Sequence, residues 1–438
     1  MKSVLTFVAA LLLAWPAAAA VEIEEVTTPG GLTAWLVEDH SIPFTALEIR
    51  FRGGTSLDRP GKRGAVYLMT GLLEEGAGDM DAQAYARAQE SLAASFGYDA
   101  GDDSVTISAR FLTENRDAAI DLLRQTIHAP RFDPDAVDRV RAQVISGLQS
   151  DAKNPNAIAG REMSAAIYGD HPYASPGEGT PASVAALTRD DLLAAHAAVF
   201  ARDRIYIGAV GDITADELGV LLDGLLGDLP ETGAPIPGEA DLTVTGGTTV
   251  VDFDTPQSVA LFVQPGIERD DPDFFAAYIL NHILGGGGFE SRLMTEVREK
   301  RGLTYGVYSY LAPKDLAAIY VGSVSSANDR IAEAIEVIRA EWARAAADGV
   351  TETELQEAKT YLTGAYPLRF DGNGRIAGIM VGMQMEGLPI DYIATRNDQV
   401  NAVTLEDINR VAGALLDPDH LHFFVVGRPE GLEGAAAN

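Results

Sequence analysis

Histidine is the first side chain to consider for metal chemistry, because the chain has seven histidines and no cysteine. A zinc site carried on one helix needs two histidines three or four residues apart, since those positions share a helix face. No two histidines have this spacing; they are His40, His128, His171, His196, His282, His420 and His422. His420 and His422 could face one side of a strand, but we favour a solvated strand end. The spacing therefore predicts no metal site.

Signatures of other active sites are incomplete. The glycine-rich run LGGGGFESRL lacks the Gly-Lys-Ser/Thr ending of a phosphate-binding loop, and Glu290 stands where a dinucleotide fingerprint needs glycine or alanine. The sequence has no Gly-x-Ser-x-Gly elbow, and without cysteine it has no thiol nucleophile. We therefore expect neither a nucleotide site nor a serine or cysteine hydrolase.

Arg298 and Tyr305 are the donor side chains that the local pattern places at a junction. The run SRLMTEVREK predicts a helix closed by Gly302, and LTYGVYSYL predicts a strand directly after it. A guanidinium and a phenol can both donate hydrogen bonds to a peptide carbonyl, but neither can activate water. The plainer interpretation is that Arg298 pairs with Glu296 or Glu299 and that Tyr305 belongs to the core.

The elements that would position these residues are read from hydrophobic periodicity. The predicted strands are FTALEIRFRG, SVTISARFL, DRIYIGAVGD, SVALFVQPG, AAIYVGSV and LHFFVVG. The predicted helices include GAVYLMTGLLEEG, AAIDLLRQTIH, TRDDLLAAHAAVF, RIAEAIEVIRAEWARAA and TETELQEAKTYLTGAY. Capping boxes at Thr188/Asp191, Thr351/Glu354 and Thr404/Asp407 mark three helix starts. Because strands and helices do not alternate strictly, we expect an α+β fold with mostly antiparallel sheets and helices packed on one face.

The second half of the chain repeats the first. The stretch from Val184, VAALTRDDLLAAHAAVFARDRIYIGAVGD, is echoed by VNAVTLEDINRVAGALLDPDHLHFFVVGR from Val400, so the offset is 400 − 184 = 216 residues. The runs NRDAAIDLLRQTI and NDRIAEAIEVIRAE precede them in the same order. A duplicated domain explains both pairs.

A run rich in proline and glycine, PETGAPIPGEADLTVTGG, separates the repeats. We place a linker at residues 231–247, between an N-terminal domain at 21–230 and a C-terminal domain at 248–432. A short tail, 433–438, follows. A chain of this length exceeds what one hydrophobic core usually supports, which favours two domains.

The first twenty residues have the pattern of a secretory signal peptide, with Lys2, an apolar stretch and a small-residue end before Val21. We therefore expect an exported protein, in the periplasm. No later segment approaches twenty uninterrupted apolar residues, so we expect no membrane span. The net charge of −31 repels phosphate backbones, so we expect no nucleic-acid partner.

Four segments resemble landmarks of the pitrilysin/insulinase family of zinc peptidases, in the family's order. They are GGTSLDRPGKRGAVYLMTGLLEEGAG, HPYASPGEGTPASVAALTRDDLLAAHAAVF, LGGGGFESRLMTEVREKRGLTYGVYS and EGLPIDYIATRNDQVNAVTLEDINRVAGALLDP. Active members of that family carry His-x-x-Glu-His on the helix after the first GG turn. The resemblance places Tyr67 and Gly71 at the two histidines and Thr70 at the glutamate, and none of the three can replace the original group.

The resemblance also assigns a role to the Arg298/Tyr305 pair, whose seven-residue spacing matches the residues with which family members hold the substrate backbone. It implies a non-catalytic, substrate-binding subunit of a heteromeric zinc endopeptidase acting on peptides or unfolded segments. This chain would bind no cofactor, and a homologous, zinc-bearing partner would complete the heterodimer. Two alternatives stay open: a structural or assembly subunit without a peptidase role, and a self-sufficient metallopeptidase with an unrecognised metal site.

Overall fold

The computed structural model describes residues 22–432 and 435–436, so the predicted signal peptide at 1–20 lies outside the described residues. The strands of the first half are β1 (Glu24–Thr27), β2 (Thr33–Glu38), β3 (Phe44–Arg52), β6 (Ser95–Ala100), β7 (Ser104–Leu112) and β8 (Ile205–Gly211). A small hairpin, β4 (Gly76–Ala77) and β5 (Met80–Asp81), stands apart from that sheet. The strands of the second half are β9 (Gly247–Asp252), β10 (Gln257–Pro265), β11 (Val307–Lys314), β12 (Ala317–Ala327), β13 (His422–Gly427) and β14 (Ala435–Ala436).

The helices follow the same division. Those of the first half are α1 (Ala65–Thr70), α2 (Ala82–Ser91), α3 (Arg116–His128), α4 (Pro134–Asp151), α5 (Pro155–Tyr168), α6 (Pro181–Ala185), α7 (Arg189–Val199) and α8 (Ala215–Leu226). Those of the second half are α9 (Phe274–Asn281), α10 (Ile331–Asp348), α11 (Glu352–Gly364), α12 (Asn373–Met385), α13 (Tyr392–Ala402) and α14 (Leu405–Leu415). Within the described part of the chain, no helix combines the length and apolar character that crossing a bilayer requires.

The two six-stranded sheets have the same strand order. The first runs β1-β2-β8-β3-β7-β6, and the second, taken in the same direction, runs β14-β9-β13-β10-β12-β11. In both, one inner pair is parallel, β2 with β8 and β9 with β13, and the pairs beyond it are antiparallel. Only the outermost strands differ, since β1 is antiparallel to β2 and β14 is parallel to β9. The predicted duplicated α+β fold is confirmed.

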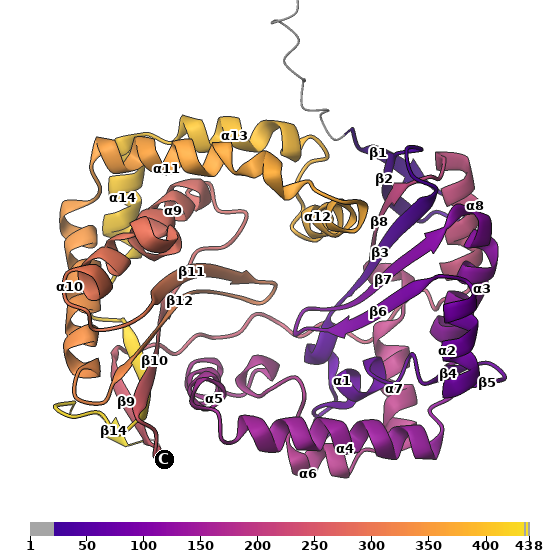
Figure 1. Cartoon of the computed structure of the whole chain (residues 1–438), viewed down its shortest axis with the longest axis horizontal. Coiled ribbons are helices and arrows are strands. Elements are labelled where there is room, and N and C mark those ends of the chain that lie inside the picture. Colours follow the sequence, from indigo (N-terminus) through magenta and orange to yellow (C-terminus); the bar gives the residue numbers. More distant parts are fainter. Residues whose placement is uncertain (1–21, 433–434, 437–438) are drawn as a thin grey trace, which may run out of the picture.

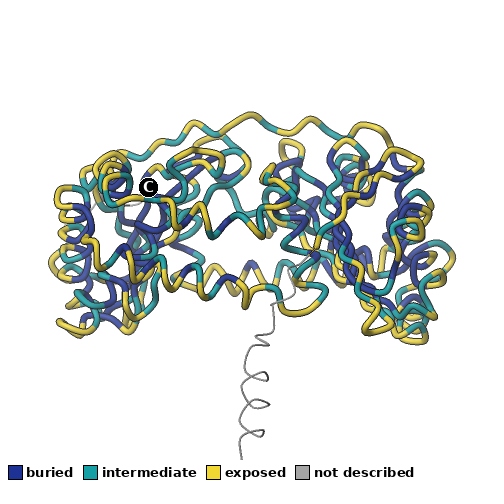
Figure 2. The backbone as a smooth tube through the Cα atoms, turned by 90° about the horizontal axis from the view of Figure 1, so that it is seen from above, coloured by how far each residue is buried: buried dark blue, intermediate teal, exposed yellow. Residues whose placement is uncertain are grey.

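Burial follows the two-residue period of a sheet on β7, whereas the central strands β3, β10 and β13 are buried along most of their length. Along β7, the buried residues Val105, Ile107, Ala109 and Phe111 alternate with side chains that are less buried. Helices α3 and α8 lie on the outer side of the first sheet and α10 and α14 on the outer side of the second (Figure 1). Figure 2 shows the buried segments concentrated in two lobes, which correspond to two separate hydrophobic cores.

One helix of each half packs on the sheet of the other half. Helix α12, from the second half, packs on β8 and β3, and α5, from the first half, packs on β10 and β13. Both helices lie between the two sheets (Figure 1). At the first contact Trp35 and Val210 pack with Met380, and at the second Ile158 packs with Val426. We call this exchange of α5 and α12 the helix clasp.

Two predicted helices differ from the structure. The run GAVYLMTGLLEEG forms only the short helix α1, because Gly71 caps it and the chain turns toward Gly76, whose φ of 116° only glycine adopts readily. The run around Arg298 is helical, but Met294–Glu299 (η7) is wound as a π-helix. Gly302, at φ 61°, ends it as expected, donating its N–H to the Arg298 carbonyl at 2.8 Å.

Candidate functional site

The degenerate positions Tyr67, Thr70 and Gly71 lie together on α1 and at its end, beside one cavity. Thr70 is 2% exposed, and its hydroxyl donates to the Val66 carbonyl one turn earlier at 2.9 Å. Gly71 offers no side chain, and Tyr67 is half-buried. Burial raises the pKa of the Tyr67 phenol, and the nearby carboxylates of Glu178, Asp99 and Asp151 raise it further. Tyr67 is therefore a neutral phenol at physiological pH.

The cavity beside α1 has a volume of about 390 Å³. Its lining is Tyr67, Thr70, Gly71, Tyr98, Asp99, Ala100, Val140, Gln143, Val144, Gly147, Leu148, Asp151 and Glu178. No histidine is among these residues, and nowhere in the described chain do three or more histidine, aspartate or glutamate side chains come together as a metal site would need. Zinc, which prefers imidazole nitrogen and thiolate ligands, does not fit this cavity.

Four of the histidines form hydrogen bonds away from this cavity. His128 and His196 bond backbone carbonyls at 2.7 and 2.8 Å. His420 lies before β13 and pairs with Asp417, whereas His422 begins β13 and bonds the Gly246 carbonyl at 2.6 Å. His420 and His422 therefore do not share one face of a strand.

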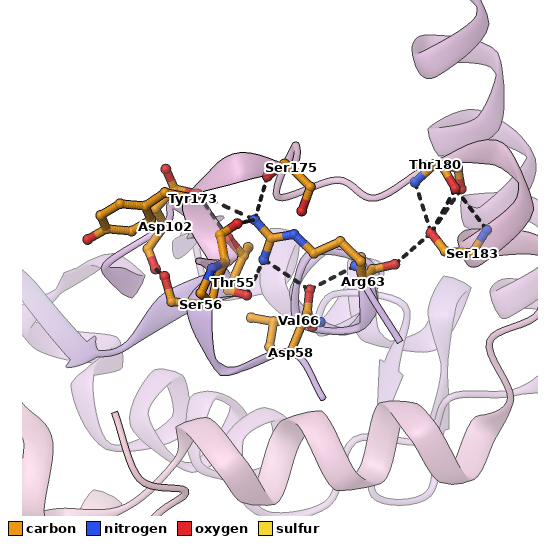
Figure 3. A network of polar contacts seen from close by, with 12 residues as sticks. Thr55, Ser56, Asp58, Arg63, Val66, Asp102, Tyr173, Ser175, Thr180 and Ser183 are labelled. Carbon is orange, nitrogen blue, oxygen red and sulfur yellow. Dashed lines mark hydrogen bonds and ion pairs between the residues drawn. The ribbon is translucent and has the colours of Figure 1, made fainter. Parts of the chain in front are cut away.

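Arg63 holds the start of α1 in place although the motif on that helix is lost. Its guanidinium donates to the carbonyl oxygens of Pro172 at 3.0 Å and Ser175 at 2.8 Å, and also to that of Thr55 (Figure 3). The buried Asp58 carboxylate accepts the N–H groups of Gly64 and Val66 at 2.8 and 2.9 Å. These bonds tie the GG turn, α1 and the segment after α5 into one rigid unit.

Arg298 is half-buried and Tyr305 is exposed, and both belong to the second half. Arg298 lies on the last turn of η7 with its guanidinium 4.7 Å from the ring centre of Phe289, which is itself exposed. Tyr305, two residues before β11, is 88% exposed. Neither side chain makes a hydrogen bond or ion pair with any residue in the described ranges. Their donors are therefore available to a bound molecule.

The plainer interpretation of this pair is wrong on both counts. Glu296 pairs with Lys300 at 2.6 Å and with Arg301 at 2.8 Å, not with Arg298. Tyr305 is outside the core. A tyrosine with this exposure gains almost nothing from packing, so its presence is not explained by stability.

The glycine-rich run positions this junction against the sheet. Residues His282–Gly286 (η5) form a π-helical turn that packs on β11, and a side chain at Gly285 would collide with Ser309 of that strand. Ser309 in turn donates to Asn281 Oδ1 at 2.9 Å. The run therefore serves close packing beside the Arg298/Tyr305 pair.

Sequence reasoning missed a row of exposed aromatic residues that begins at this pair. Tyr308 and Tyr310 are two residues apart on the edge strand β11, so they share one face, and both are exposed. Lys314 continues the same face, with Nζ 3.6 Å from the ring centre of Tyr173 and 2.5 Å from Asp102 Oδ2 in the first half. The sequence already held this signal, because Tyr308, Tyr310 and Lys314 are separated by even numbers of residues and so share one face of a strand.

Further polar contacts join the tip of the β11–β12 hairpin to the first half. Arg52 Nε lies 2.8 Å from Asp315 Oδ2, and the backbone N–H of Leu316 donates to the Tyr173 hydroxyl at 3.2 Å. Asp102 and Tyr173 also line a second cavity, of about 450 Å³, which shares Ala100, Leu148, Asp151 and Glu178 with the one beside α1. The exposed face of β11 thus leads from Tyr305 toward the degenerate site.

Comparison with known proteins gives matches over most of the chain. Residues 34–180 match the family described as Insulinase (Peptidase family M16), and residues 186–362 match the one described as Peptidase M16 inactive domain. The non-peptidase homolog YmxG of Helicobacter pylori is 27% identical over 393 residues, 89% of this chain and 90% of that protein. An uncharacterized zinc protease of Mycobacterium leprae is 26% identical over 411 residues, 92% and 91% of the two chains.

A solved structure is also similar. The crystal structure of a peptidase M16 inactive domain from Pseudomonas fluorescens is 29% identical, with a TM-score of 0.87 over 94% of this chain and 99% of that one.

Proposed function

The chain belongs to the insulinase family, peptidase family M16, and we propose that it is the non-catalytic, substrate-binding subunit of a heteromeric zinc endopeptidase. A homologous partner subunit would carry the zinc and the general base. Relatives named as a non-peptidase homolog and as an inactive domain support the non-catalytic part. The substrate-binding part rests on this chain's own residues.

The observation that carries the proposal is the contrast between two sites. At α1 the positions that would need metal ligands hold a neutral phenol, a hydroxyl bonded to its own helix, and a glycine. At the η7–β11 junction, Arg298 and Tyr305 keep their donors unengaged by the described protein. A purely structural subunit gains nothing from holding a guanidinium and an exposed phenol in this way.

Peptides or unfolded segments are the substrates that fit these donors. Arg298 and Tyr305 would donate hydrogen bonds to a peptide carbonyl oxygen, and the exposed rings of Phe289, Tyr308 and Tyr310 would contact flanking side chains. The partner's metal would supply the hydrolytic chemistry. The predicted signal peptide at 1–20 supports an exported complex, in the periplasm, and the partner would then be exported as well.

The test uses the chain without residues 1–20, alone and mixed with a zinc-bearing homologue encoded by the same organism. Zinc content is measured by mass spectrometry, and cleavage is followed with a fluorogenic peptide. We expect no zinc and no cleavage by the chain alone, and cleavage on mixing. Stoichiometric zinc with chelator-sensitive cleavage by the chain alone would show a self-sufficient metallopeptidase instead.

Substitutions at the pair then test its role. Arg298→Ala and Tyr305→Phe should each lower kcat/KM of the mixture about tenfold to a hundredfold, because each removes a charged or preorganised donor. Arg301→Ala is the matched control, since Arg301 pairs with Glu296 on the same segment, and it should leave kcat/KM unchanged. If all three variants assemble with the partner and retain full turnover, the chain is a structural subunit.

A further inference from the structure

A third cavity, with a different chemistry, lies in the second half, and its lining includes no residue of α1 and neither Arg298 nor Tyr305. It has a volume of about 590 Å³, and α9, α12, α13 and the turn Tyr366–Arg369 (η8) form its walls. Its lining is Arg269, Phe274, Phe275, Tyr278, Tyr366, Arg369, Phe370, Arg375, Gly378, Ile379, Gly382, Tyr392 and Arg396. We call it the arginine–aromatic pocket.

The charge of this pocket is opposite to that of the protein. Among the described residues, four arginines and no acidic residue line it, although the chain as a whole carries a net charge of −31. The side-chain hydrogen bonds of Arg269 and Arg396 all go to neutral acceptors. The nearby Asp273 is already held by Arg410 at 2.6 and 2.7 Å. Burial raises the pKa of Glu386, while the charge of Arg269 opposes that rise, and the two side chains form no ion pair within the described chain.

Arg396 is the deepest of the four, with 4% of its surface exposed. Its guanidinium donates to the Leu362 carbonyl at 2.8 Å and lies 4.5 Å from the ring centre of Tyr366. Neutral oxygens and ring faces offset only part of the cost of removing a full positive charge from water. A buried guanidinium without a carboxylate beside an open cavity leaves a positive potential there, which an anion would neutralise.

Aromatic side chains form much of the wall of the pocket. Arg269 lies 4.3 Å from the ring centre of Phe274 and donates to the Tyr392 hydroxyl at 2.8 Å, so both the ring and the guanidinium are held in place. A cation–π cluster that served only stability would be closely packed, because protein interiors contain few voids larger than a water molecule. This pocket instead has the size of a small-molecule site.

We propose that the arginine–aromatic pocket binds an organic anion, a carboxylate or phosphate carried on a flat aromatic or apolar body. The guanidinium groups would bind the anionic group through paired N–H donors, and the aromatic walls would cover the body. The pocket lies where α12, which packs on the sheet of the first half, meets α9 and α13. This site does not depend on the peptidase role proposed above.

The test measures binding of four naphthalene compounds to the purified chain by isothermal titration calorimetry. They are 2-naphthoate, 1-naphthyl phosphate, the neutral 2-naphthalenemethanol and the cationic 1-naphthylmethylamine. We expect at least one anion to bind about tenfold to a hundredfold more tightly than the alcohol, as one or two charge-assisted hydrogen bonds predict, and the amine not to bind. The two anions distinguish a carboxylate site from a phosphate site.

Variants locate the binding. Arg375→Gln and Arg369→Gln, both at exposed positions of the lining, should each weaken anion binding about tenfold, with circular dichroism unchanged. Arg428→Gln removes the same charge far from the pocket, where Arg428 pairs with Asp252 and Asp254, and should have no effect. Equal binding of the alcohol, equal weakening by Arg428→Gln, or no anion binding at millimolar concentration would each overturn the proposal.

Discussion

At the scale of single residues, α1 has no metal ligands and no general base, but the hydrogen bonds that hold the start of this helix are present. Thr70 and Gly71 cannot act as base or ligand, yet Arg63 and Asp58 still fix the start of the helix with a buried network. Burial raises the pKa of Asp58, while the N–H groups of Val66 and Gly64 and the charge of Arg63 oppose that rise. Such a network is costly to break, because each lost partner leaves a buried polar group unpaired.

Replacing Arg63 should therefore destabilise the protein strongly. Arg63→Ala leaves the carbonyl groups of Thr55, Pro172 and Ser175 without their donor, and we expect the free energy of unfolding to fall by about 2–4 kcal/mol. Arg59→Ala, four residues earlier, removes an exposed guanidinium that pairs with Asp191, and should cost less than about 1 kcal/mol. Urea unfolding followed by circular dichroism measures both. Similar losses in the two variants would contradict this account.

At the scale of elements, capping boxes fix where several helices begin. All three predicted capping boxes are present, at α7, α11 and α14, with further ones at α6 and α8. In the box of α11, Glu354 accepts the Thr351 N–H at 2.8 Å and also binds Arg292 at 2.6 and 2.8 Å. Burial opposes the charge of Glu354, but Arg292 and the Thr351 donors outweigh it and lower the pKa of Glu354 to about 2.

The Glu354 carboxylate makes a contribution to the free energy of unfolding that decreases as the pH falls. Because its pKa is lower in the folded chain than the ordinary 4.5, its stabilisation is complete above about pH 5 and disappears as the pH falls toward 2. Glu354→Gln should thus lower the free energy of unfolding by about 1–3 kcal/mol at pH 7 and by much less at pH 3. Urea unfolding at the two pH values tests this.

The control lies two residues away on the same helix. Glu352 accepts a hydrogen bond from Gln356 and has no arginine partner in the part of the chain that the structure describes, so Glu352→Gln should change stability by less than about 0.5 kcal/mol at either pH. A difference between wild type and Glu354→Gln that stays constant from pH 7 to pH 3 would exclude the assigned ion pair as its source.

Sequence periodicity predicted elements better than it predicted sites. Strand β7 was predictable because one of its faces is apolar, and β10 because it is a nearly continuous apolar run. Arg298 and Tyr305 were placed by a glycine stop and a strand start. Helix α12 has no clear apolar face, because it packs between β8, β3 and its own half. The arginine–aromatic pocket could not be predicted, since Arg269 and Arg396 are brought together only by the tertiary fold. A local sequence pattern contains no information on contacts between residues that are far apart in the chain.

At the scale of the whole molecule, the helix clasp makes the halves depend on each other. Without α12, the sheet of the first half would expose Trp35 and Val210, and without α5, the second sheet would expose Val426. The tip of the β11–β12 hairpin adds polar contacts through Lys314 and Asp102. Two duplicated units that each complete the other's core should be more stable together than apart.

The contact between Gly208 of β8 and helix α12 allows a direct test of whether the two halves stabilise each other. A methyl group at Gly208 on β8 would lie 2.8 Å from the Ala377 carbonyl oxygen and 3.1 Å from Val381 Cγ2, so Gly208→Ala must push α12 away from the sheet. We expect the free energy of unfolding to fall by about 1–3 kcal/mol, as overpacking usually costs. Gly224→Ala is the matched control, because a methyl group there meets no atom within 4 Å and the position is inside helix α8. That substitution should leave stability unchanged or raise it by up to about 1 kcal/mol. Equal melting temperatures for the two variants would show that α12 can leave the sheet without cost, and that the halves are stable independently.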